Sequence, residues 1–259
     1  MGREDIKDGD ACAKTAPGYF LVTGQIHGDE RSTAFLLKAL IRLNLLEDLY
    51  PKGLLVIPTV NPDGAARNQR KNIRGVDLNR NFPSRHFLKA SRTLREIENP
   101  GPPEYVASEV RALMPLILSS RAYLDLHGFV QTIYLPRIRG ALREGHDPSV
   151  VFADDDKNMN AARVVQAAMD ELSGFTYDIR DGVADGDIGA SDDYAALQGI
   201  PALSLEMPCS HRNLYKKPLP AALASAYASV IKIWFNGVGV NETLTKNKNR
   251  PLDGKERAH

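Results

Sequence analysis

The chain has few cysteines, almost no net charge and no long hydrophobic run. Its 259 residues contain two cysteines, Cys12 and Cys209, which are too few for a disulfide framework, so we treat both as free thiols. The 33 basic and 32 acidic side chains give a formal charge of +1, which lacks the overall positive field of a nucleic-acid binder. No apolar run approaches the roughly 18 residues that a membrane span needs. Neither a nucleic acid nor a membrane is therefore expected as a partner.

The two ends of the sequence bear on location and domain organisation. The polar start, residues 1–8, lacks the apolar region of a signal peptide, which predicts a cytoplasmic protein. No linker rich in Gly, Ser or Pro divides the sequence and no internal repeat is visible, so we expect a single domain over residues 1–240. The polar residues 241–259 are expected to form a mobile C-terminal tail.

Hydrophobic patterning indicates strands that alternate with helices. Unbroken apolar runs, typical of strands buried on both faces, occupy residues 18–23, 53–60, 122–126 and 200–205. Amphipathic segments with helical spacing occupy residues 32–46, 104–120, 158–172 and 221–235. This alternation predicts a three-layer α/β fold, in which helices flank a mostly parallel sheet.

Side chains able to bind a metal follow three of the predicted strands. His27 and Glu30 lie three residues apart where helical spacing begins, so both are expected to project to one side of a first helical turn. His127 ends the third predicted strand and Glu206 ends the fourth. Ligands of such sheets gather beyond the carboxyl ends of the strands, so these side chains are expected to meet.

Two longer motifs carry a family resemblance. Asn-Pro-Asp-Gly at residues 61–64 and Gly-Val-Asp-Leu-Asn-Arg-Asn-Phe-Pro at residues 75–83 follow the His-x-x-Glu pair in order. This ordered set, over residues 18–236, resembles the zinc metallocarboxypeptidases, the carboxypeptidase A-like enzymes, and above all the short bacterial branch that includes murein peptide amidases. The resemblance implies a mixed, roughly eight-stranded sheet within the three-layer architecture.

The resemblance also implies a catalytic zinc site. His27, Glu30 and His127 would hold one zinc ion, whose fourth position stays open to water as in carboxypeptidase A. Glu206, in Glu-Met-Pro, matches the family's general acid/base. Asp125 lies two residues before His127 on the same side of a strand, and it has two interpretations: an acceptor that orients the histidine, or a buried side chain satisfied by the backbone.

Residues within and between the two motifs match the family's anion-binding side chains. Arg70 matches the arginine that stabilises the developing oxyanion, and Asn79 and Arg80 match the pair that clamps the substrate's terminal carboxylate. A guanidinium suits this clamp because its planar fork binds both carboxylate oxygens. Without the motif, Arg80 would be interpreted as a surface salt-bridge partner. Three basic neighbours are alternatives to Arg70: Arg67, Lys71 and Arg74.

Three features near the site depart from the family's pattern or bear on its substrate. The family's carboxypeptidases carry a tyrosine on the loop before the catalytic glutamate, whereas residues 181–191 contain none, and Tyr177 and Tyr194 only flank this stretch. Asp29 stands where pancreatic-type enzymes have arginine. The stretch 178–193 is rich in aspartate, which would favour a substrate with an amino group near the scissile bond, such as diaminopimelate, if it faces the site.

The sequence thus predicts a zinc-dependent metallocarboxypeptidase that hydrolyses an amide bond next to a free carboxylate. The substrate would be a peptide or a muropeptide, with a murein peptide amidase as the narrower hypothesis. Two alternatives are an amino-acid deacylase of the succinylglutamate desuccinylase or aspartoacylase kind and a non-catalytic zinc-binding module. The intact motifs at residues 61–64 and 79–83 argue against the first, and the presence of Glu206 argues against the second. The sequence predicts no oligomeric state.

Overall fold

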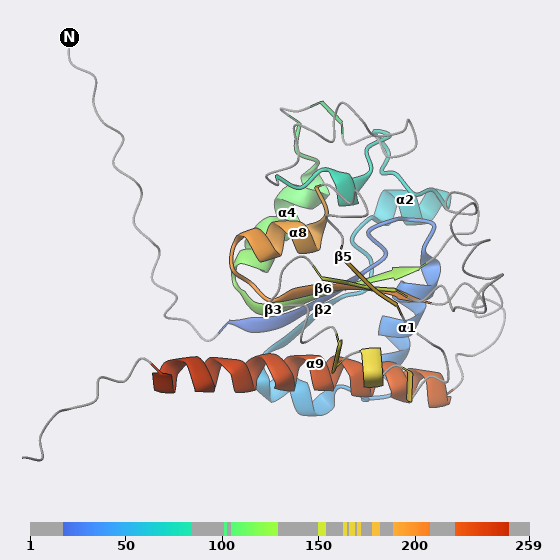
Figure 1. Cartoon of the computed structure of the whole chain (residues 1–259). Coiled ribbons are helices and arrows are strands. Elements are labelled where there is room, and N and C mark those ends of the chain that lie inside the picture. Colours follow the sequence, from blue (N-terminus) through green and yellow to red (C-terminus); the bar gives the residue numbers. More distant parts are fainter. Residues whose placement is uncertain are drawn as a thin grey trace, which may run out of the picture.

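The computed structural model describes residues 18–83, 101–102, 105–128, 150–153, 163–164, 166–168, 170–171, 178–181, 189–207 and 221–248. These residues form a sheet with helices packed on both of its faces (Figure 1). Helices α1 (Arg31–Arg42) and α9 (Ala221–Lys248) cover one face, and α4 (Ser108–Leu118) and α8 (Ser191–Leu197) cover the other. The predicted three-layer α/β architecture is confirmed.

The sheet contains six strands within the described residues, in the order β2-β1-β3-β6-β4-β5. The strands are β1 (Tyr19–Gly24), β2 (Leu54–Ile57), β3 (Ser120–Gly128), β4 (Val150–Ala153), β5 (Asp178–Asp181) and β6 (Ala202–Met207). The first four strands of this order are mutually parallel, β4 is antiparallel to β6, and β5 is parallel to β4. The four predicted strands are confirmed as β1, β2, β3 and β6. The family resemblance implies roughly eight strands, and this number stays a prediction because it also concerns residues outside the described part.

The helices follow the predicted amphipathic segments closely. Predicted helices 32–46, 104–120 and 221–235 correspond to α1, α4 and α9, and the described residues between 163 and 171 are helical as well. Four short helical elements are not predicted from the sequence: η1 (Glu47–Lys52), α2 (Pro62–Arg67), η2 (Leu78–Arg80) and α8.

Helix α9 continues further than the sequence predicts. A mobile tail is expected from residue 241, whereas α9 runs to Lys248. The extension contains Glu242, Leu244 and Lys246, which are good helix formers, and adding a residue to an existing helix is easier than starting a new one. The remaining residues 249–259 lie outside the described part. Within that part, no helix is long and apolar enough to cross a membrane.

Alternation along β3 separates two hydrophobic cores. Leu124 and Leu126 pack on the side of α1 and α9, where Trp234 is buried and the rings of Phe20 and Phe235 stack with centroids 4.3 Å apart. Tyr123 packs on the opposite side, against residues of α4 and α8. Because successive strand residues face opposite sides, Asp125 and His127 share the face of Tyr123.

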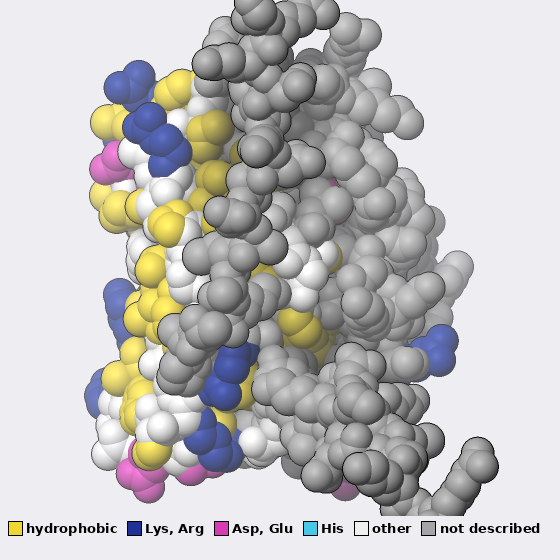
Figure 2. Space-filling view, turned by 90° about the vertical axis from the view of Figure 1, so that its left-hand side faces the viewer, with side chains coloured by type: hydrophobic (Ala, Val, Ile, Leu, Met, Phe, Trp, Pro, Cys, Tyr) yellow, Lys and Arg dark blue, Asp and Glu magenta, His cyan; other side chains and the backbone are white. Residues whose placement is uncertain are grey.

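Large apolar side chains are also exposed at scattered positions. They include Phe35, Ile41 and Leu43 on or just after α1, and Tyr50 in η1. On the face shown in Figure 2, hydrophobic and basic side chains are interspersed over the part drawn in colour. Scattered exposure of this kind is ordinary for a folded protein.

Candidate metal centre

The loop between β1 and α1 carries His27 and Glu30. The prediction that both residues lie on a first helical turn is wrong, because Glu30 is the last residue before α1 and His27 lies in the preceding bend. The backbone folds back instead, because the Glu30 N–H donates to the His27 carbonyl (3.1 Å) and Thr33 Oγ1 donates to the Glu30 carbonyl (2.9 Å). This turn brings His27 Nδ1 within 2.6 Å of Glu30 Oε1.

Gly28 allows this loop to lie directly against α2. Its N–H donates to the Arg70 carbonyl (3.2 Å), and a Cβ at this position would overlap the backbone of Gly64 and Ala65. Asn61 caps α2 by accepting from the Gly64 N–H (2.9 Å), and its Nδ2 donates to the Arg70 carbonyl (3.2 Å). The Asn-Pro-Asp-Gly motif therefore holds the His27 loop in place.

His127 joins the pair from the end of β3. Its Nδ1 lies 3.3 Å from Glu30 Oε2, and one donor atom from each of His27, Glu30 and His127 lies within 4.8 Å of the other two. All three side chains are buried, and the N–H of Gly128 donates to Glu30 Oε2 (2.8 Å). Two imidazoles and a carboxylate are a ligand set that zinc prefers in catalytic sites. The predicted group of ligands is thus brought together and fits a zinc ion.

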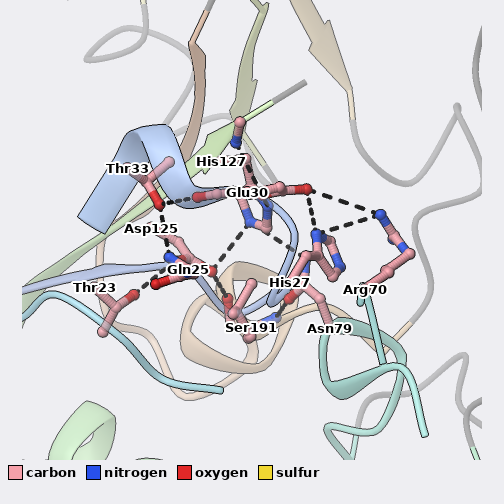
Figure 3. A network of polar contacts seen from close by, with 12 residues as sticks. Thr23, Gln25, His27, Glu30, Thr33, Arg70, Asn79, Asp125, His127 and Ser191 are labelled. Carbon is pink, nitrogen blue, oxygen red and sulfur yellow. Dashed lines mark hydrogen bonds and ion pairs between the residues drawn. The ribbon is translucent and has the colours of Figure 1, made fainter. Parts of the chain in front are cut away.

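Carboxylates hold the outer nitrogens of both imidazoles. His27 Nε2 lies 3.2 Å from Asp77 Oδ1, and His127 Nε2 lies 3.1 Å from Asp125 Oδ2. A carboxylate at Nε2 fixes a proton there, so Nδ1 of each ring is the atom that can bind a cation once it has lost its own proton. Both rings are therefore oriented with Nδ1 toward the place where a cation would sit (Figure 3).

The protonation of the three groups reflects their close packing. Burial alone would raise the pKa of Glu30, but the adjoining His27 and His127 outweigh it and hold this pKa well below its usual value. Burial would lower the pKa of His127, yet Asp125 and Glu30 raise it well above the ordinary value. Burial and Arg70 would lower the pKa of His27, and the charges of Glu30 and Asp77 raise it. A negative group between two imidazoles thus attracts positive charge, as a cation site requires.

Arg70, from the basic stretch, reaches the site. Its Nε donates to Asp77 Oδ2 (2.7 Å), and its Nη1 lies 3.3 Å from His27 Nδ1 and 3.9 Å from Glu30 Oε1. The alternatives Arg67 and Arg74 are exposed. The structure therefore places Arg70, rather than these two neighbours, beside the predicted ligands.

Asn79 and Arg80 lie in η2, and Asn79 is beside His127. Asn79 Nδ2 is 3.4 Å from His127 Nε2, and Asn79 Oδ1 accepts from the Ser191 N–H (2.9 Å). Arg80 Nη1 donates to the Asn79 carbonyl (2.8 Å), and only 3% of Arg80 is exposed. Its burial rules out the interpretation as a surface salt-bridge partner. Gly189 packs so tightly against the Arg80 carbonyl that a side chain there would collide with it.

Glu206 lies next to His127 across the sheet. The two residues are register partners in the parallel strands β6 and β3. Register partners direct their side chains to the same face, so Glu206 stands on the face that carries His127. Its side chain is partly exposed, unlike the buried ligands. Arg70 is partly exposed as well, and the Oε2 atom of Glu206 is itself buried.

Asp125 has side-chain partners on every side, which decides between its two interpretations. Its Oδ2 accepts from His127 Nε2 and from Ser191 Oγ (2.7 Å), and its Oδ1 accepts from Thr23 Oγ1 (2.6 Å). Burial would raise its pKa, but His127 and these hydroxyls hold the pKa below the usual value. Asp125 therefore orients His127. The sequence analysis does not identify Thr23 or Ser191, because their proximity depends on strand pairing and on the position of α8.

The structure describes some of the residues at which the chain departs from the family's pattern. Tyr194 is 5% exposed and its ring lies 5.8 Å from that of Phe82, so it is a core residue and does not replace the missing loop tyrosine. Tyr177 lies outside the described residues. Asp29 is partly buried and its pKa is raised, first by burial and then by the charge of Glu30. Asp192 and Asp193 are buried at the start of α8.

The fold and the metal-binding group define a zinc carboxypeptidase. The chain matches the zinc carboxypeptidase family over residues 6–225 and belongs to this family. Murein peptide amidase A of Escherichia coli (strain K12) is 37% identical over 75 residues, which cover 29% of this chain and 30% of that protein. Carboxypeptidase SOL1 of Arabidopsis thaliana is 37% identical over 79 residues, which cover 26% of this chain and 16% of that protein. The aligned part thus spans less than a third of either relative.

Solved structures share the fold at low sequence identity. Carboxypeptidase A from Helicoverpa armigera superimposes with a TM-score of 0.61 and 15% identity, over 86% of this chain and 61% of that chain. Murein-tripeptide amidase MpaA from Escherichia coli O157 gives a TM-score of 0.51 and 17% identity, over 86% and 82% of the two chains. The D,L-carboxypeptidase Csd4 from Helicobacter pylori gives 0.55 and 20%, over 86% and 51%. These likenesses confirm the predicted fold class.

Proposed function

We propose that this protein is a zinc-dependent metallocarboxypeptidase that hydrolyses an amide bond next to a free carboxylate. One observation carries the proposal: a buried His27, Glu30 and His127 group, in a member of the zinc carboxypeptidase family, has an arginine on one side and an asparagine on the other. A zinc ion at this group would lower the pKa of a water molecule from about 15.7 to near 7 and polarise the scissile carbonyl.

Glu206 supplies the proton transfers in this proposal. A carboxylate accepts a proton from the attacking water and then donates it to the leaving nitrogen, which is general acid/base catalysis. Its register pairing with His127 and its partial exposure support this role. Its position at the carboxyl end of a parallel strand is where ligands of such sheets bind.

Arg70, Asn79 and Arg80 bind the charged parts of the substrate. The Arg70 guanidinium stands beside Glu30 and His27, where it would stabilise the negative charge that develops on the carbonyl oxygen. Asn79 and Arg80 would clamp the terminal carboxylate, since an amide and a guanidinium both donate hydrogen bonds to it. The enzyme would then act on the amide bond next to that carboxylate.

The proposed substrate is a cell-wall peptide in which diaminopimelate is released. Murein peptide amidase A is among the relatives of this chain, and Asp192 and Asp193 are buried directly after Ser191, whose backbone holds Asn79. A carboxylate near the clamp would favour a leaving group that carries a second amino group. A charge-assisted contact of this kind contributes about 1.5–3 kcal/mol, or roughly tenfold to hundredfold in preference.

The alternatives have less support. An amino-acid deacylase of the desuccinylase or aspartoacylase kind is not favoured, because the chain belongs to the zinc carboxypeptidase family over residues 6–225. A non-catalytic zinc-binding module would not need a general acid/base, whereas Glu206 is present beside the ligands.

A competition assay tests both the reaction and the substrate class. The zinc-loaded protein is offered γ-glutamyl-diaminopimelate peptides together with peptides that end in phenylalanine or leucine, and the products are followed by liquid chromatography with mass spectrometry. We expect release of the terminal residue, with the diaminopimelate peptide cleaved faster. Faster cleavage of the apolar peptides would overturn the cell-wall substrate, and no cleavage of any peptide would overturn the carboxypeptidase.

Two matched variants refine the substrate test. Asp192→Asn and Asp193→Asn each remove one charge from α8 and retain the side-chain size. The variant that removes a carboxylate facing the amine should reduce the preference for diaminopimelate about tenfold and leave cleavage of the apolar peptides unchanged. An unchanged preference in both variants would remove the α8 carboxylates from substrate recognition.

A further inference from the structure

A buried hydrogen-bond network lies behind His127, on the side away from Glu30. Asp125 is its centre, and its carboxylate accepts from three donors: Thr23 Oγ1, Ser191 Oγ and His127 Nε2. Asp125, Thr23 and Ser191 are all 0% exposed. Removing a carboxylate from water is costly unless hydrogen bonds compensate, so a fully buried aspartate needs these donors.

The donors come from elements far apart in the chain. Thr23 lies on β1 and is the register partner of Asp125 on β3, while Ser191 begins α8. Thr23 Oγ1 also lies 2.9 Å from the hydroxyl of Tyr123, which closes the network on the core side. The two hydroxyls thus fix both oxygens of the carboxylate, and the orientation of Oδ2 determines where His127 Nε2 is held.

Ser191 makes a second contact through its backbone. While its Oγ holds Asp125, its backbone N–H donates to Asn79 Oδ1 (2.9 Å). This bond directs the Asn79 amide nitrogen toward the site, 3.4 Å from His127 Nε2 (Figure 3). Ser191 therefore contacts both Asp125, which orients the candidate metal ligand His127, and Asn79, whose amide is a candidate for binding the substrate carboxylate.

We propose that Ser191, with Thr23, is a positioning residue that fixes the Asp125 carboxylate and through it the metal ligand His127, and that Ser191 ties this ligand to Asn79. The inference rests on the proposed function in taking His127 as a ligand. Partners of metal-bound histidines typically contribute about 10- to 100-fold in metal affinity. The hydroxyls of Thr23 and Ser191 act on Asp125, the partner of His127, and not on the ligand itself. Removal of either hydroxyl is therefore expected to weaken metal affinity by about tenfold, the low end of that range.

Four single variants test the proposal by zinc affinity, measured by competition with a chelator. Thr23→Val removes a hydroxyl at nearly constant volume, and Thr23→Ser retains it. Ser191→Ala removes the second hydroxyl but retains the backbone N–H that holds Asn79. Ser204→Ala is the matched control, because Ser204 is buried on the same sheet face and its Oγ has no hydrogen-bond partner within the described residues. We expect Thr23→Val and Ser191→Ala to weaken zinc binding about tenfold, with Thr23→Ser and Ser204→Ala unchanged.

A double-mutant cycle separates positioning from a general loss of stability. Asp125→Asn alone should weaken zinc binding by about 10- to 100-fold, and adding Ser191→Ala to it should cause no further loss, since the hydroxyl acts through the carboxylate. The visible spectrum of the cobalt-substituted protein should change in Thr23→Val and Ser191→Ala, because it reports ligand geometry. If Ser191→Ala does not fold, Ser191→Cys replaces it, since a thiol is only a weak donor.

Wild-type zinc affinity and cobalt spectra in Thr23→Val and Ser191→Ala would overturn the inference, as would full additivity with Asp125→Asn. The ligand assignment is tested independently by His127→Ala. Zinc binding by His127→Ala at wild-type affinity would overturn that assignment, whereas a defect in His127→Ala with none in Ser191→Ala would overturn only the inference.

Discussion

His127 and Glu206 are direct neighbours across the parallel strands β3 and β6. The backbone hydrogen bonds between these two strands set the distance between the residues, and no loop is involved. The candidate ligand His127 and the candidate acid/base Glu206 are therefore held at a fixed distance. Sites supported by strands hold their geometry more precisely than sites on loops. This arrangement makes the proposed roles of the two residues testable one at a time.

Glu206→Gln should retain the fold and the metal but lose turnover. Glutamine matches the shape of glutamate and cannot carry a proton, so kcat is expected to fall by about 10²- to 10⁴-fold. Zinc content by elemental analysis and kcat on a cleaved peptide are the two measurements. A near-normal rate at neutral pH would show that Glu206 is not the acid/base.

His127→Ala should lose bound metal. The substitution removes one of three ligands, and the remaining His27 and Glu30 are too few for a stable zinc site. Elemental analysis of the purified variant beside the wild type measures the effect, and circular dichroism checks the fold. Equal zinc content in the two proteins would remove His127 from the ligand set.

Arg80→Ala should abolish the discrimination between free and amidated carboxyl ends. Amidation removes the negative charge that the guanidinium binds, so it should weaken catalysis in the wild type and matter little in the variant. The measurement is kcat/KM on matched free and amidated peptides. Equal wild-type activity on both would contradict an exopeptidase pocket.

Removal of zinc should lower the temperature of unfolding. A ligand that binds only the folded state stabilises it by about 2.7 kcal/mol at one hundred times its Kd. Thermal unfolding is followed with and without a chelator, and His127→Ala is the control in which added zinc should give little shift. An unchanged unfolding temperature in the wild type would argue against a zinc ion at the buried group.

Zinc affinity should rise with pH. The pKa of His127 is raised well above its ordinary value because, although burial lowers it, Asp125 and Glu30 favour the protonated ring, and the pKa of His27 is raised as well. A ring must lose its Nδ1 proton to bind zinc, so protons compete below these pKa values and binding strengthens as pH rises through them. Calorimetry in buffers of different ionisation enthalpy measures the protons released. Binding without proton release near neutral pH would contradict this.

The sequence predicts the sheet centre and the ligands, because both depend on local patterns. Apolar runs mark β1, β2, β3 and β6, and the motifs supply His27, Glu30 and His127. Strand β5 (Asp178–Asp181) is charged at both ends and gives no apolar run, and β4 (Val150–Ala153) is apolar but only four residues long.

What the sequence could not predict depends on contacts between distant segments. The pairing of Thr23 with Asp125 is set by the register of β1 and β3, and a shift of one residue would reverse the face of each side chain. The spacing of His27 and Glu30 predicts a helical turn, whereas a bend separates His27 from α1, and the pair still meets. The short polar Ser191 gives no signal until α8 is placed against η2.

The tight approach of Gly28 to the backbone of Gly64 and Ala65 limits how this enzyme can be altered. The His-x-x-Glu loop and helix α2, which carries the Asn-Pro-Asp-Gly motif, pack so closely that neither can shift without the other. In the sequence, α1, η1 and β2 separate them. An engineer who wished to reshape the site could lengthen the connections around η1 on the far side of the sheet with little effect on zinc. The same change at position 28 would have to be matched by a redesign of α2.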